Sequence, residues 1–255
     1  MSGGCWKVVG RSAEFDAIPG GGRLDLARPR EGLEWSRGRC SLLRTHVPGL
    51  SDPVPESMLV DVYVREDDLV VTYGPTPDSQ LHTQVYWRRV AQGSAVGLHW
   101  VFSVWTPRLD ARPVIHLGHR WGDTIPWLAS ALVEGQAGSA ELPGFHELRA
   151  EMTQERSGAV ARLPASSLLL ERSTTDANAP SLVLMAYPTD VVRGSVSSAE
   201  ATPRAVEYDL LEEHLEKGVI RRAQAMVWWV PREGDAQLAR ELYRQFLDAP
   251  PPLTT

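Results

Sequence analysis

The stretch "MLVDVYVREDDLVVTYG", residues 58–74, decides the fold class. Two runs of largely apolar residues, rich in valine, flank the charged turn "REDD" at 65–68. Such runs around a short polar turn are typical of a β-hairpin. The sequence on both sides repeats short β-type runs between Pro, Gly and Asp, so it predicts a mainly β protein.

Further strands are predicted where apolar or alternating runs lie between turn residues. These runs are 23–29, 83–90, 96–105, 113–121, 166–172, 181–188 and 218–231. Neither face of 218–231 is purely polar, so we expect burial on both sides over its second half. In 83–90, Trp87 is expected to point inward.

Two helices are predicted near the C-terminus. The segment 205–218 places Tyr208, Leu211 and Leu215 at helical spacing before Gly218. The segment 235–248 places Leu238, Leu242 and Phe246 on one stripe, with Asp235 as the N-cap. Residues 126–157 are ambiguous: 125–135 fits a helix or a strand, and 145–155 fits a short helix.

The predicted architecture is an antiparallel β-sandwich of two packed sheets in a single domain, residues 1–255. A C-terminal α-helix covers an edge or face, and one or two short helices complete it. The alternative is a strongly bent single sheet or an open barrel around the helices.

Composition limits the partners. The formal net charge of -6 argues against nucleic acid, because phosphate binding favours a basic surface. Neither an N-terminal signal-peptide core nor an apolar run of membrane-spanning length is present. The two cysteines are too few for a disulfide framework. We therefore expect a soluble, cytoplasmic protein that does not bind membranes.

Several stretches resemble a family of uncharacterised bacterial proteins, in scattered blocks over roughly residues 59–230. These stretches are "DVYVREDDLVVTYG" (61–74), "QVYWR" (84–88), "FSVWTPRLD" (102–110), "LVLMAYPTDV" (182–191) and "LEKGVIRRA" (215–223). The resemblance implies a β-rich domain with no known activity, and it supplies no catalytic residues.

The stretch "VIHLGHRWGD", residues 114–123, carries two histidines three residues apart. On a strand, this spacing places His116 and His119 on opposite faces. If 98–105 pairs with 113–121 as a hairpin, His99 lies opposite His119, while His116 joins the apolar face of Leu98, Trp100, Phe102 and Val104. His99, His119 and Asp123 would then be acceptable zinc ligands, although no cofactor is required. The alternative is two half-exposed histidines on an aromatic face.

Aromatic side chains form the second candidate feature. Trp105 and Trp121 would flank the two histidines, and Arg88 follows Trp87 on a neighbouring strand. Aromatic rings and arginines on a sheet can grip sugars, or they can simply form the core and surface cation–π contacts. We therefore predict a non-enzymatic binding or interaction domain, with a small molecule or glycan as ligand. Its predicted ligand-binding residues are His99, Trp105, His119, Trp121 and Arg88. The alternative is a metal-dependent or histidine-based enzyme with its site on the 98–121 hairpin.

Overall fold

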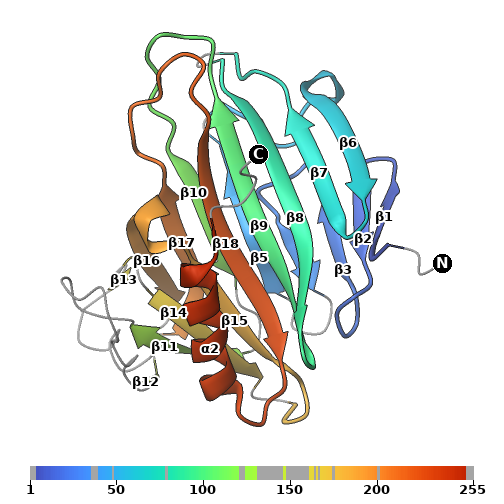
Figure 1. The fold of residues 1–255 in the computed structure, drawn as a ribbon, viewed down its shortest axis with the longest axis vertical. Coiled ribbons are helices and arrows are strands. Elements are labelled where there is room, and N and C mark those ends of the chain that lie inside the picture. Colours follow the sequence, from blue (N-terminus) through green and yellow to red (C-terminus); the bar gives the residue numbers. More distant parts are fainter. Residues whose placement is uncertain are drawn as a thin grey trace.

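The computed structural model describes residues 4–35, 40–47, 49–77, 80–120, 124–130, 146–147, 161–163, 165, 167–173, 176–199 and 202–250. Within these residues, the chain forms two nine-stranded antiparallel sheets, here called sheet A and sheet B, and one C-terminal α-helix (Figure 1). Two short 3-10 turns, η1 (Glu56–Met58) and η2 (Pro188–Asp190), lie in connections. The predicted β-sandwich with a C-terminal helix is confirmed.

The strands are given in their spatial order. Sheet A consists of β1 (Trp6–Val9), β2 (Ser12–Phe15), β3 (Gly22–Asp25), β4 (Leu33–Trp35), β5 (Cys40–His46), β10 (Ile115–Arg120), β17 (Thr202–Leu210), β16 (Val191–Ala199) and β13 (Ala161–Leu163). Sheet B consists of β12 (His146–Glu147), β11 (Thr124–Ser130), β14 (Ser167–Ser173), β15 (Ser181–Ala186), β18 (Arg221–Val230), β9 (Ala95–Trp105), β8 (His82–Gln92), β7 (Asp68–Tyr73) and β6 (Leu59–Arg65).

The main core lies between the two sheets. Strand alternation sends every second side chain inward, which is why Leu98, Trp100, Phe102 and Val104 of β9 all lie there, as predicted. Trp87 is also in this core, at 2% exposed. Burying such large apolar side chains is the main stabilising contribution to a sandwich of this kind.

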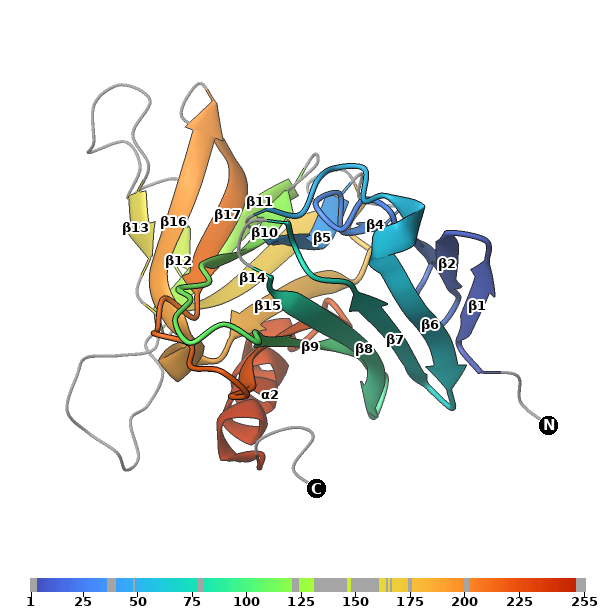
Figure 2. The same ribbon diagram turned by 90° about the horizontal axis from the view of Figure 1, so that it is seen from above.

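A second, smaller core forms where α2 (Asp235–Asp248) packs on the outer face of sheet B (Figure 2). The helix buries Ala239, Leu242, Tyr243 and Phe246 there, whereas Leu238 of the predicted stripe is only partly buried. Both faces of the second half of β18 are consequently covered, as expected.

The start of α2 differs from the prediction. Gly234, at a φ of 72°, holds the N-cap position, and Asp235 is the first helical residue. The Asp235 carboxylate instead accepts hydrogen bonds from Arg172 (2.6 and 2.9 Å) and Ser181 (2.5 Å). These contacts hold the helix against β14 and β15.

The predicted hairpin of 98–105 with 113–121 is wrong. β9 pairs with β8 and β18 in sheet B, whereas β10 pairs with β5 and β17 in sheet A. A two-residue turn with Gly93 at a φ of 57° lets β9 pair with β8 along its whole length. The segment between β9 and β10 therefore connects the two sheets instead of turning within one.

The predicted helix 205–218 is also wrong. Its first residues belong to β17, in which Val206, Tyr208 and Leu210 point into the main core and Glu207 points outward. The alternating pattern and the two neighbours β10 and β16 outweigh the helical spacing of the leucines.

The remaining predictions have mixed outcomes. The hairpin β6–β7 is confirmed, and the predicted strands at 166–172 and 181–188 form β14 and β15, which pair with each other. Residues 124–130 form β11, and β12 occupies two residues of the predicted helix 145–155, so a strand replaces a helix there. The other residues of 126–157 lie outside the described part of the chain.

Candidate functional site

The outer face of sheet A brings polar side chains from β5, β10 and β17 into two adjacent rows. In the first row, His46 lies opposite His116, which lies opposite Asp209. In the second row, Arg44 lies opposite Gly118, which lies opposite Glu207. The intervening Leu117 points into the core, so alternation along β10 is what sends this set outward.

His116 and Asp209 form a close pair within the first row. The Nδ1 atom of His116 lies 2.6 Å from Oδ1 of Asp209. Because a carboxylate only accepts hydrogen bonds, the imidazole donates from Nδ1. The Arg193 guanidinium, 3.6 Å away, adds positive charge on the other Asp209 oxygen. The His116 side chain remains 38% exposed, so solvent and ligands can reach it.

His46 is held in a different way. The guanidinium of Arg30 lies 2.9 Å from His46 Nε2 and also donates to the carbonyl oxygen of Leu50 at 3.1 Å. Arginine has no acceptor, so His46 must accept at Nε2. Burial lowers the pKa of His46, and the neighbouring Arg30 and His116 lower it further. The rings of His46 and His116 lie 5.2 Å apart.

A cavity of about 320 Å³ opens over these rows. It is lined by Arg30, Arg44, Thr45, His46, His116, Gly118 and Glu207. Gly118 forms part of its floor, where a Cβ atom would lie 3.6 Å from Arg44 and from the Val206 carbonyl oxygen. The absent side chain therefore leaves space within the second row, between Arg44 and Glu207.

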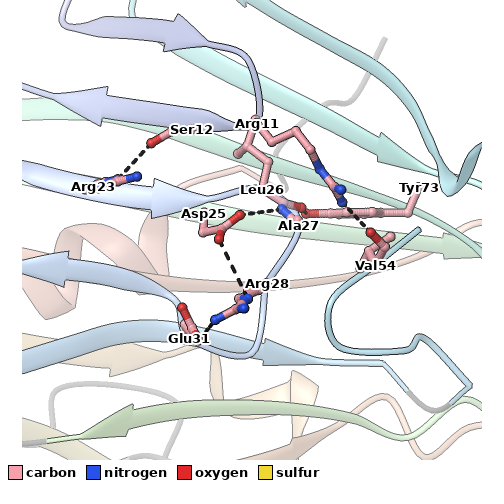
Figure 3. A network of polar contacts seen from close by, with 10 residues as sticks. All are labelled: Arg11, Ser12, Arg23, Asp25, Leu26, Ala27, Arg28, Glu31, Val54 and Tyr73. Atoms are coloured by element: carbon pink, nitrogen blue, oxygen red, sulfur yellow. Dashed lines mark hydrogen bonds and ion pairs between the residues drawn. The ribbon is translucent and has the colours of Figure 1, made fainter. Parts of the chain in front are cut away.

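The loop between β3 and β4 carries Arg30 to this cavity. Figure 3 shows the polar contacts that hold the residues around Arg30 in this loop. Asp25 accepts a hydrogen bond from the Ala27 amide at 2.9 Å, and the Tyr73 hydroxyl donates to the Leu26 carbonyl oxygen at 3.0 Å. Arg28 pairs with Glu31 at 3.0 Å on the outer side of the loop. Arg11 donates to the Val54 carbonyl oxygen in the same network.

The far end of this loop requires glycine. Gly32 has a φ of 70°, and a Cβ there would overlap the Leu42 carbonyl oxygen. Arg44 Nε donates to the Arg30 carbonyl oxygen at 2.9 Å, which ties the loop to β5. The loop is thus held from several sides, and Arg30 is held with it.

Three of the predicted ligand-binding residues lie together on sheet B instead. Arg88, His99 and Trp105 share its outer face, with Arg88 directly opposite His99. Arg88 pairs with Asp68 at 2.8 Å, and Trp105 stacks on His82 at 5.3 Å.

His99 itself lies close to α2. Its Nε2 is 2.9 Å from Gln224 Oε1, and its ring contacts Phe246 edge-on. Burial lowers the pKa of His99 to about 4. The residue is therefore neutral and partly covered.

His119 points the other way from the prediction. It lies between the sheets, 1% exposed, with Nε2 3.0 Å from Oε2 of Glu171 on β14. His116 and His119 do lie on opposite faces, but the core and solvent sides are exchanged. The His99–His119 pairing behind the zinc prediction is wrong because the two strands belong to different sheets.

Trp121 and Asp123 lie outside the described residues, so their predicted roles stay predictions. Among the residues that the structure describes, no group of three or more His, Cys, Asp or Glu side chains is arranged to hold a metal ion. Cys5 and Cys40 are both buried, and they are not joined in a disulfide. No helix in the described ranges is both long and apolar enough to span a membrane.

Sequence reasoning missed Arg30, His46 and Asp209. They lie 16 and 163 residues apart along the chain, so no local spacing marks them. One signal was present: Glu207 and Asp209 alternate with Val206, Tyr208 and Leu210, which places both acids on one strand face.

No family model and no curated protein matches the sequence. Among solved structures, an aldose epimerase homologue from C. elegans is similar at 10% identity, over 66% of this chain and 67% of that chain, with a TM-score of 0.43. A galactose mutarotase related enzyme from Lactobacillus acidophilus is similar at 7% identity, over 86% and 90%, with a TM-score of 0.42. A galactose mutarotase-like protein from Lactobacillus casei is similar at 13% identity, over 66% and 71%, with a TM-score of 0.38.

Proposed function

We propose that the cavity on sheet A binds a neutral, sugar-sized polyhydroxylated molecule and transfers protons to and from it. The observation that carries this proposal is that two adjacent histidines have opposite partners: a guanidinium at His46 Nε2 and a carboxylate at His116 Nδ1. Arg30 holds the proton of neutral His46 on Nδ1, because Nε2 accepts from the guanidinium. Asp209 holds the proton of His116 on Nδ1, so Nε2 of neutral His116 is the basic nitrogen.

This arrangement supplies a proton donor and a proton acceptor side by side. His46 donates from Nδ1, and His116 accepts at Nε2. The Asp209 carboxylate stabilises the imidazolium that forms when His116 takes a proton, as carboxylates do in histidine-based sites. A pair of this kind suits general acid–base catalysis on one substrate.

The lining favours a neutral ligand with hydroxyl groups. Arg30 and Arg44 supply donors, while Glu207, together with Asp209 behind His116, balances their charge. A phosphate or carboxylate would meet those acids, whereas hydroxyls both donate and accept and can use every group. The volume lies near the lower end of the range for small-molecule sites, which fits one sugar ring.

The reaction that needs no more than these groups is interconversion of sugar anomers. His116 removes the proton from the anomeric hydroxyl, His46 protonates the ring oxygen, and the bond between that oxygen and the anomeric carbon breaks. Rotation of the free aldehyde and the reverse transfers close the ring with the other configuration. Both histidines return to their starting protonation, so the step balances.

The test is the rate of anomer interconversion of freshly dissolved α-D-glucose and α-D-galactose, followed by polarimetry and NMR exchange. We expect the protein to accelerate it and His116→Ala to remove about 99% of the acceleration, the lower range for loss of a general base. His214→Ala is the matched control, because His214 pairs with Asp110 at 2.9 Å on the surface outside the cavity.

Two outcomes separate the candidates. If the protein binds sugar without accelerating anomer interconversion, and His116→Ala loses that binding, the cavity has a non-enzymatic carbohydrate-binding function. Acceleration that His116→Ala and His46→Ala leave intact would contradict the proposed site.

A further inference from the structure

A third polar row continues the candidate site across sheet A. Glu14, Arg23, Glu34, Ser41 and Arg120 lie directly opposite one another in that order, on β2, β3, β4, β5 and β10. All are exposed except Ser41, which is half-buried. Opposed side chains on a sheet lie about 4.5–5.5 Å apart at Cβ, so the row is continuous.

A second cavity lies over this row. Its volume is about 710 Å³. The row residues Glu14, Arg23, Glu34 and Ser41 line it with the Gly20–Gly22 turn, and Phe15, Trp35 and Cys40 of the main core add an apolar part. β5 belongs to both cavities: Cys40 and Ser41 line the larger, and Arg44, Thr45 and His46 line the smaller. The two cavities are therefore neighbours along one strand.

The chemistry of the row resembles that of the first cavity. Carboxylates alternate with a guanidinium and a hydroxyl, so acceptors and donors are interleaved. Arg23 donates to the Ser12 hydroxyl at 2.9 Å, and within the described ranges no ion pair joins it to Glu14 or Glu34. The two carboxylates thus remain available to ligand hydroxyls.

We infer that the ligand of the candidate site is the end of a linear oligosaccharide, whose following units lie across β5, β4 and β3. This inference rests on the proposed function of the smaller cavity. β3 lies three strands from β10, about 14 Å at the usual strand spacing, which is farther than one sugar ring extends. The terminal unit would occupy the cavity beside His116, and the larger cavity would hold the units behind it.

The experiment compares ligand length by isothermal titration. The probes are glucose and galactose with the linear di- and trisaccharides of each. We expect the trisaccharide of the preferred sugar to bind at least on the order of tenfold more tightly than its monosaccharide, a difference of about 1.4 kcal/mol. Glu34→Gln and Arg23→Ala should remove this advantage and leave monosaccharide affinity unchanged.

Matched controls are Glu216→Gln and Arg108→Ala, which change exposed residues outside both cavities. His116→Ala should weaken binding at every length. Equal affinity for monosaccharide and trisaccharide would overturn the inference and leave the proposed function standing. The same holds if Glu34→Gln and Arg23→Ala bind the trisaccharide as tightly as the control variants do. Failure of every sugar to bind would overturn both.

Discussion

Two histidine–carboxylate pairs lie on the same strand, three residues apart, in opposite environments. His116 meets Asp209 on the outer face of sheet A, with the two side chains 38% and 23% exposed. His119 meets Glu171 between the sheets, with the two side chains 2% and 4% exposed. The partners also differ: Asp209 belongs to the neighbouring strand, whereas Glu171 comes from sheet B.

The difference shows that strand alternation can place one histidine–carboxylate pair in the core, where it stabilises the fold, and a second pair on the surface, where it can contact a ligand. The buried pair bridges the two sheets, and Glu171 also accepts from the Cys40 thiol at 3.5 Å. The outer pair connects only adjacent strands, so its contribution to the fold is small. It lines a cavity, and its second imidazole nitrogen is where a ligand would be recognised.

The largest expected effect belongs to the buried pair. Glu171→Ala leaves His119 buried without its carboxylate and should lower the free energy of unfolding by about 3–5 kcal/mol, as for other broken buried pairs. Chemical denaturation measures this loss. The control is the double variant His119→Leu with Glu171→Leu, which removes both polar groups and should recover most of the stability. A loss below about 1 kcal/mol in Glu171→Ala would mean that the pair does not bridge the sheets energetically.

The next effect concerns the outer pair and its chemistry. Asp209→Asn keeps the shape of the side chain but removes the charge that stabilises imidazolium on His116. The rate of anomer interconversion should fall about 100-fold, with little change in unfolding free energy. Asp110→Asn, which changes the partner of His214, is the control and should leave the rate unaltered. An unchanged rate in Asp209→Asn would show that the outer pair takes no part in acid–base catalysis.

A third histidine, His99, can be compared with these two pairs, because its hydrogen-bond partner is neutral. His99 contacts the Gln224 amide, and burial lowers its pKa to about 4. Between pH 6.5 and about 4, the unfolded chain therefore binds a proton that the folded protein does not, so stability falls as the pH falls. The loss should be on the order of 3 kcal/mol, since one pKa unit corresponds to about 1.4 kcal/mol.

Denaturation curves of wild type and His99→Gln across this pH range measure the effect. The comparison between variants is needed because burial raises the pKa of Asp190 to about 6, which acts in the opposite direction: protonated Asp190 favours the folded state. As the pH falls, the stability of His99→Gln relative to wild type should rise by the stated amount. If both proteins lose stability in parallel, His99 does not titrate below its usual range.

Much of the fold follows from alternation, which is local. Leu98, Trp100, Phe102 and Val104 form one inner face, and Trp228 and Trp229 point to the two different cores, as neighbours on a strand must. The wrong helix prediction at 205–218 also came from a local pattern, because Tyr208, Leu211 and Leu215 fit helical spacing as well. Only the neighbouring strands, which are distant in sequence, favour the extended form.

The candidate site depends on pairing partners, which no local pattern specifies. His116 is 93 residues from Asp209 in the chain, and the two meet because β10 lies between β5 and β17. The prediction placed His99 opposite His119 by assuming that consecutive strands pair. The chain instead crosses between sheets after Trp105, and the histidine assigned to the core, His116, faces the cavity.

The smallest expected effect completes the comparison of the two pairs. His116→Ala removes a half-exposed ring whose ion pair is screened by water, so the unfolding free energy should change by less than about 1 kcal/mol. His119→Ala leaves the Glu171 carboxylate buried without the imidazole and should lose several times more, about 3 kcal/mol or above. The two variants change the same residue type on the same strand, so propensity differences cancel and only the environment remains. Denaturation of both variants under the same conditions, at pH 7.5, gives the two values. Equal losses would mean that the outer pair is as structural as the inner one, and the assignment of His116 to ligand chemistry would lose its physical basis.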